Sequence, residues 1–119
     1  MTKGPYICGL DAAMDVVGGK WKALILWELR VCPRRFGQLR QSLKGISEKM
    51  LVQRLRELEA AGIVYREVHH EVPLKVEYGL TELGTALFLT LLPLADWGEQ
   101  YMAETDEAPH AVTTTGALA

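Results

Sequence analysis

The sequence is short of cysteine and of long apolar runs, and both shortages exclude classes of protein. Its 119 residues include two cysteines, Cys8 and Cys32, too few for the disulfide framework of a small secreted domain. The most apolar run, 86–95, is interrupted by Thr90 and Pro93 and is far shorter than the roughly 20 residues that span a bilayer. Residues 1–10 contain no apolar segment typical of a secretory signal. We therefore expect a soluble, cytoplasmic protein.

The sequence also lacks the spacings that mark catalytic, nucleotide or metal sites. The Gly18-Gly19-Lys20 stretch is not a phosphate-binding loop, because Met14 and Trp21 stand where that loop needs Gly and Ser or Thr. No Ser/His/Asp arrangement is recognisable. The residues that most often bind metals lack the paired short spacings of zinc sites: Cys8, Cys32, His69, His70 and His110. We expect no enzymatic activity, no metal and no cofactor.

The net charge is small, −2, but it is unevenly distributed. Residues 20–56 hold ten Lys and Arg against two acids, whereas residues 57–119 hold eleven acids against Arg66 and Lys75. The net charge alone argues mildly against a nucleic-acid partner. A basic block beside an acidic half nevertheless suggests one face that meets a polyanion, although chance segregation is an alternative in so small a protein.

Apolar periodicity and capping residues predict the order of helices and strands. An irregular arm, 1–9, precedes helices, a β-hairpin with its tip at 71–75, a last helix kinked or interrupted at Pro93, and a polar disordered tail, 103–119. Asp11, Ser47 and Thr81 are expected to cap helices. The expected helices are 11–17, 20–31, 36–43, 47–61 and 82–101, and the expected strands are 63–70 and 76–80.

The helix from Ser47 has two distinct faces. Leu51, Leu55 and Leu58 recur at positions i, i+4 and i+7 and form one apolar stripe. Lys49, Gln53 and Arg56 fall on the opposite face, and Met50, Arg54 and Glu57 lie on the flanks. The pattern fits an ordinary surface helix as well as a helix that binds a partner.

The neighbouring elements favour the second interpretation. A short helix, a tight turn at Gly45 and the helix from Ser47 form a helix-turn-helix, and the hairpin that follows adds a wing. In such a unit the helix from Ser47 is the one that enters the major groove of DNA. We expect an α+β, mainly α, winged helix-turn-helix domain over residues 10–102, flanked by N- and C-terminal dimerisation helices.

Several stretches resemble the HxlR-type winged-helix regulators, relatives of the MarR class. The resemblance extends from Cys8 to about Gly98 and rests on Gly18-Gly19-Lys20-Trp21, Arg35-Phe36, the segment 47–59 and Val76-Glu77-Tyr78. It implies a small, dimeric bacterial or archaeal transcription factor. In the wing this chain has Pro73-Leu74-Lys75 where the family often has Pro-Pro-Arg, so one cation is kept.

The candidate contacts to double-stranded DNA lie in the helix from Ser47, in the arginines before and within the third helix, and in the wing. Gln53 can pair with adenine edges, and cations such as Arg54 can hold phosphates. The alternative is a solvated, solubilising face. We interpret His69 and His70 as exposed strand residues rather than as a metal site. The candidates are Arg34, Arg35, Arg40, Ser47, Lys49, Met50, Gln53, Arg54, Arg56 and Lys75.

A second copy of the chain is the other expected partner. The segment 86–97 is apolar nearly all round, so part of its surface needs a partner, and the resemblance implies that the helix around 10–17 shares the interface. The predicted interface residues are Leu10, Met14, Val17, Leu87, Leu91, Leu94 and Trp97.

The signal that the protein senses is open at this stage. The resemblance implies an oxidant or electrophile acting at Cys8, with Cys32 as a second candidate, while a small packed residue is the alternative. The aromatic residues could line a pocket for a small-molecule effector or simply pack in the core: Trp21, Trp27, Trp97 and Tyr101. The main alternative function is a winged-helix module whose basic face docks an acidic protein or RNA.

Overall fold

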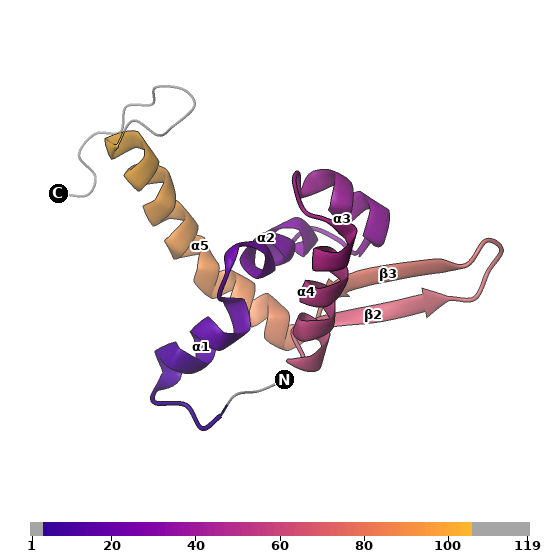
Figure 1. Ribbon diagram of the computed structural model, residues 1–119, viewed down its shortest axis with the longest axis horizontal. Helices are drawn as coiled ribbons and strands as arrows, with labels where there is room; N and C mark the ends of the chain where they lie inside the picture. The colour runs from indigo at the N-terminus through magenta and orange to yellow at the C-terminus, as the bar shows by residue number, and fades with distance from the viewer. Residues whose placement is uncertain (1–3, 106–119) are drawn as a thin grey trace. The chain divides into compact units, whose positions relative to one another are not determined.

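The structure is a computed structural model in which residues 4–105 are described. The chain divides into two compact units, Met1–Phe88 and Leu89–Ala119, which are considered separately. In the described part, helices and a small sheet follow one another as α1 (Gly9–Val17), α2 (Lys20–Leu29), β1 (Arg34–Arg35), α3 (Phe36–Ser42), α4 (Glu48–Ala60), β2 (Val64–His69), β3 (Lys75–Leu80) and α5 (Glu82–Glu104). Figure 1 labels the five helices of this part and the strands β2 and β3. This order confirms the predicted α+β, mainly helical, winged helix-turn-helix fold.

The core of the first unit lies among α2, α3 and α4. Each helix contributes leucine or isoleucine side chains that are almost fully buried, namely Ile25, Leu26, Leu39, Leu51, Leu55 and Leu58. Helix α2 buries Ile25, Leu26 and Leu29, whereas Leu24 is 40% exposed. The helix ends at Leu29, two residues before the expected Val31.

Capping side chains fix where two of the helices begin. The Ser47 hydroxyl accepts a hydrogen bond from the Met50 N–H at 3.0 Å, and the Thr81 hydroxyl accepts one from the Gly84 N–H at 2.9 Å, as predicted. The prediction for Asp11 was wrong. Helix α1 begins two residues earlier, at Gly9, and the Asp11 carboxylate accepts the N–H of Ile7 at 3.0 Å.

The sheet has the strand order β1-β3-β2, and both pairings are antiparallel. Strands β2 and β3 form the expected hairpin, which projects beyond α4 in Figure 1. Strand β1 was not predicted. Its two residues carry no strand pattern of their own and are defined only by pairing of Arg34 with Tyr78 and of Arg35 with Glu77.

Helix α5 starts in the first unit and continues into the second. Gly84 lies so close to the chain before β2 that an added Cβ atom would clash with the Ile63 carbonyl oxygen. Pro93 does not interrupt the helix, contrary to one of the expected outcomes, and α5 extends to Glu104. Most of the predicted tail, 103–119, lies outside the described residues. No helix of the described part is long and apolar enough to cross a membrane.

Candidate nucleic-acid interface

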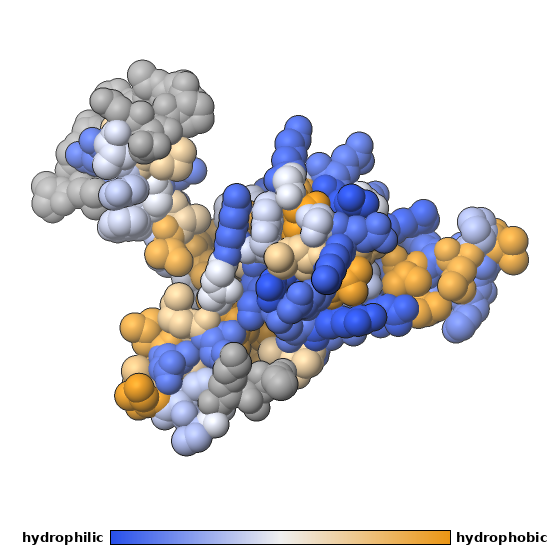
Figure 2. All heavy atoms as spheres, in the orientation of Figure 1, coloured by the Kyte–Doolittle hydropathy of each residue, from blue (hydrophilic) through white to orange (hydrophobic). Residues whose placement is uncertain are grey.

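Helix α4 separates its apolar and polar side chains as its sequence predicts. Leu51, Leu55 and Leu58 are at most 1% exposed. Lys49, Gln53 and Arg56 are exposed on the other side of the helix. In Figure 2 hydrophilic side chains gather over α3 and α4. The leucine stripe therefore fixes α4 on the core and leaves its polar face accessible.

The flank of α4 carries an ion-pair network that links it to α2. The Arg54 guanidinium donates a hydrogen bond to the Glu57 carboxylate at 2.5 Å, and the Lys22 ammonium lies 3.7 Å from the same carboxylate oxygen. Burial raises the pKa of Glu57, but the Arg54 hydrogen bond and the charges of Arg54 and Lys22 outweigh it and hold that pKa below its usual value. Arg54 is therefore already paired, whereas Lys49 and Arg56 are exposed and form no ion pair within residues 4–105.

The three predicted arginines before and within α3 differ in their surroundings. Arg34 is half-buried, and its Nε donates to the Glu28 carbonyl oxygen at 3.3 Å. Arg35 is exposed at the start of α3. Arg40 is exposed and forms a 3.5 Å ion pair with Glu48, at the first turn of α4. Both Arg35 and Arg40 present their charge to solvent at the helix-turn-helix.

Ser47, Met50 and Lys75, the remaining predicted contacts, all have interactions within the chain. The Ser47 hydroxyl serves as the cap of α4. Met50 is half-buried and lines a cavity of about 530 Å³ between the α1–α2 turn and α4, together with Trp21 and Arg54. The Lys75 ammonium lies 3.7 Å from the Glu77 carboxylate, at the base of the hairpin tip.

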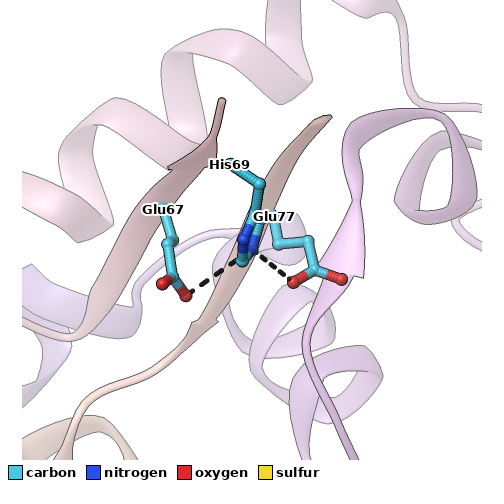
Figure 3. Close-up of side chains that lie close together, drawn as sticks. All are labelled: Glu67, His69 and Glu77. Atoms are coloured by element: carbon cyan, nitrogen blue, oxygen red, sulfur yellow. Dashed lines mark hydrogen bonds and ion pairs between the residues drawn. The ribbon is translucent and has the colours of Figure 1, made fainter. Parts of the chain in front are cut away.

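The hairpin also contains a cluster that the sequence analysis missed. Glu67, His69 and Glu77 bring their side chains together on the wing, as Figure 3 shows. Short-spacing rules for metal sites do not find such a set, because one member comes from the opposite strand. The signal that could have found it is the two-residue alternation of 67 and 69 combined with the strand pairing.

The predicted sensing and dimerisation residues lie mostly on the surface of the single chain. Cys8 and Cys32 are both free thiols and exposed. In the first unit Leu10 is 70% exposed and Met14 53%, and in the second Leu94 is 61% exposed. Trp97 is also exposed, whereas Val17, Leu87 and Leu91 are half-buried.

The aromatic residues considered for an effector pocket have three different surroundings. Trp21 lines the cavity of about 530 Å³. Trp27 packs against Phe88, with ring centres 5.8 Å apart. Trp97 and Tyr101 stack on each other in the second unit, with ring centres 5.2 Å apart. Of these four described residues, Trp21 is the one that lines a cavity able to hold an effector.

Comparison with known families adds to this geometry. The family described as HxlR-like helix-turn-helix matches residues 16–106, most of the chain. The chain belongs to this family. As in the sequence-based expectation, membership identifies a DNA-binding transcriptional regulator and not an enzyme.

Individual HxlR-family proteins and solved structures are also similar to this chain. The chain is 46% identical over 96 residues to the HTH-type transcriptional regulator YkvN of Bacillus subtilis, covering 81% of each chain. The solved redox regulator HypR in its oxidised form is 45% identical, with a TM-score of 0.75 over 78% of this chain and 96% of that chain. The reduced form of the regulator YodB of B. subtilis is 40% identical, with a TM-score of 0.72 over 80% of this chain and 94% of that chain.

Proposed function

We propose that this HxlR-family regulator acts as a homodimer on a near-palindromic operator, which it reads with the exposed face of α4. One observation carries this proposal: the leucine stripe is buried while Lys49, Gln53 and Arg56 are exposed on the opposite side of α4. In a helix-turn-helix the second helix lies in the major groove with its outer side chains on base edges.

Base recognition is assigned to Gln53. Its amide can donate to and accept from an adenine edge at the same time, which gives sequence discrimination. Lys49 and Arg56 flank it on the exposed face and supply positive charge for phosphates or guanine. Arg54, which is already paired with Glu57, contributes through the charge of the network.

The surrounding cations hold the DNA backbone in this proposal. Arg35 and Arg40 are exposed at the helix-turn-helix, and Lys75 lies at the wing tip. Such contacts set affinity and register without reading sequence. Since its target is chromosomal DNA, we place the regulator in the cytoplasm, at the nucleoid.

Dimerisation is supported by apolar surface that the single chain leaves open. Helix α1 has no buried residue, and α5 exposes Leu89, Leu94 and Trp97. A second copy of the chain would cover these faces and set two recognition helices roughly 34 Å apart on a two-fold symmetric site.

Thiol chemistry is the proposed signal. Cys8 directly precedes α1, the helix assigned to the dimer interface, and it is exposed to an oxidant or electrophile. The related protein HypR is described as a redox regulator, and YodB has been solved in reduced and diamide-treated forms. A small molecule in the cavity beside Trp21 is the alternative signal.

The test is to sequence the DNA that the protein binds in the cell and to measure binding to the recovered site against excess random DNA. The expected result is a near-palindrome bound by two chains. Equal binding to random DNA, or binding of RNA or an acidic protein instead, would contradict the proposal.

The thiol signal is tested by treating the protein–operator complex with diamide. Diamide should release the operator from the parent protein but not from Cys8→Ser. If diamide releases the operator equally from both proteins, Cys32 becomes the candidate sensing residue.

A further inference from the structure

The wing hairpin places two carboxylates and one imidazole within reach of a single point. Glu67 and His69 are two residues apart on β2 and so share a face, and Glu77 of β3 pairs directly with Glu67. His69 Nε2 lies 3.0 Å from a Glu77 oxygen and 3.7 Å from a Glu67 oxygen. The three atoms lie within 4.8 Å of one another (Figure 3).

The pairing of Glu67 with Glu77 places two negative charges directly opposite each other in the hairpin. Like charges directly opposite each other on antiparallel strands destabilise the pair. Lys75 compensates one oxygen of Glu77, at 3.7 Å. In the described residues the ion-pair partner of Glu67 is His69 alone, and that contact requires a protonated imidazole. A cation between the three side chains would relieve this repulsion.

The distances suit a metal ion after a small adjustment. Ligand atoms about 2.0–2.1 Å from a tetrahedral zinc ion lie roughly 3.3 Å from one another. The observed 3.0 and 3.7 Å bracket this value. Glu67 is 57% exposed and can move its carboxylate, while Lys75 holds the outer oxygen of Glu77 and leaves the inner one facing His69.

The donor set selects the class of ion. Magnesium and calcium favour all-oxygen sites, whereas an imidazole nitrogen with carboxylates suits zinc and related divalent transition metals. We propose that Glu67, His69 and Glu77 form a site for a divalent transition metal of the zinc class, and that the bound ion strengthens contact between the wing and DNA.

The claim that the bound ion strengthens contact between the wing and DNA rests on the proposed function. It follows from the charge that the ion adds to the wing. His69 and Lys75 form the last strand pair before the hairpin tip, so the ion lies where the wing would approach DNA. Glu67, Glu77, Lys75 and Arg35, which pairs with Glu77 in the sheet, sum to a charge of zero, and a dication changes the sum to +2. A bound dication is the largest local charge at such a site, and it would add attraction for phosphates.

The site is tested by calorimetric titration of zinc chloride into the full-length protein without DNA. All proteins carry Cys8→Ser and Cys32→Ser, because thiolates also bind zinc. His69→Gln, Glu67→Gln and Glu77→Gln are compared with His70→Gln, which removes an exposed histidine beside the cluster. We expect one zinc per chain in the parent and in His70→Gln, and affinity at least about tenfold weaker in the three ligand variants.

Absence of saturable binding, or equal binding by all five proteins, would overturn the site. Magnesium chloride should give no binding, and an equal response to magnesium would overturn the assigned class. Because three ligand variants are compared, one that folds poorly does not leave the site undecided.

The effect on DNA is measured by fluorescence anisotropy with and without zinc. Zinc should raise DNA affinity several-fold in the parent and in His70→Gln but not in His69→Gln. Unchanged affinity in a protein that binds both zinc and DNA would overturn the regulatory half. A protein that binds zinc but no DNA under any condition would instead contradict the proposed function and leave the metal site standing.

Discussion

Helices α4 and α5 are both rich in leucine, yet they use it in opposite ways. Helix α4 buries Leu51, Leu55 and Leu58 almost completely. Helix α5 is longer but buries only Gly84, while Leu89 is 56% exposed and Leu94 61%. The apolar stripe of α4 is buried within its own chain, whereas much of the apolar surface of α5 is exposed on the single chain, where the proposed dimer would cover it. Leucine content alone therefore does not show what a helix does. The elements packed against the helix decide whether its leucines stabilise the fold or remain available for an assembly.

The largest expected effect is loss of the α4 stripe. Leu55→Ala removes a side chain that is 1% exposed and leaves a cavity, which should lower the free energy of unfolding by about 2–5 kcal/mol. Urea unfolding followed by circular dichroism measures this loss. Leu83→Ala, on an α5 side chain that is 60% exposed, should cost less than about 1 kcal/mol. Equal losses of unfolding free energy in the two variants would show that α4 and α5 do not differ in how their leucines stabilise the fold.

The next effect is on assembly. Leu94→Glu places a charge on the exposed apolar face of the second unit, and burying it in a dimer should cost at least about 2 kcal/mol. Light scattering at micromolar concentration should show a dimer for the parent and a monomer for the variant. Leu83→Glu is the matched control, since Leu83 is equally exposed but lies outside the predicted interface. A parent that is monomeric with and without DNA would contradict the proposal.

A third, smaller effect concerns the exposed face of α4. Gln53→Ala should weaken binding to the cognate operator by about 1–3 kcal/mol, because an alkyl group cannot replace the bidentate amide. Binding to random DNA should hardly change. Anisotropy titrations on both DNAs measure the difference, and Ala60→Ser, also on an exposed position of α4, serves as a control. Equal weakening on both DNAs would show that Gln53 holds DNA without reading it.

Within α4, the sequence predicted the structure where periodicity and caps determine it. The spacing of Leu51, Leu55 and Leu58 was sufficient to orient the helix, and the Ser47 hydroxyl fixed its start. Periodicity does not report the pairing of one charged side chain with another. The ion pair of Lys22 with Glu57 depends on how α2 packs against α4, which no local pattern encodes.

The hairpin illustrates the same limit. Its strands follow from β-branched and aromatic residues, but β1 exists only through its pairing with β3. The cluster of Glu67, His69 and Glu77 requires the strand register, since a slip of one residue would move Glu77 to the other face. Features that depend on long-range register or packing therefore had to come from the structure.

A fourth prediction compares two arginines of α4. Arg56 is exposed, whereas Arg54 is half-buried and paired with Glu57. Arg56→Ala should lower the slope of log K against log salt by about 0.9, the value for one lost phosphate contact. Arg54→Ala should weaken cognate and random DNA alike with a smaller change in slope. Salt titrations of both variants measure this, and a larger slope change for Arg54 would mean that it leaves Glu57 to hold phosphate.

The smallest expected effect concerns the ion pairs of Glu57 and how much they stabilise the packing of α4 against α2. The pKa of Glu57 is lowered in the folded chain, so its stabilising contribution is complete above the ordinary value of 4.5 and is lost as the pH falls through the lower folded value. Because the carboxylate is 35% exposed, solvent screens the pair and the contribution should be below about 1 kcal/mol. Glu57→Gln should therefore be slightly less stable than the parent at pH 7.

Urea unfolding of both proteins at neutral and acidic pH measures this difference. The deficit of Glu57→Gln should shrink as the pH falls, because the parent carboxylate becomes protonated and equally neutral. Glu59→Gln is the control, since Glu59 has no ion pair within the described part of the chain. A deficit that is constant across pH would mean that the amide disturbs packing, and that α4 is held by its leucine stripe without help from the charges on its flank.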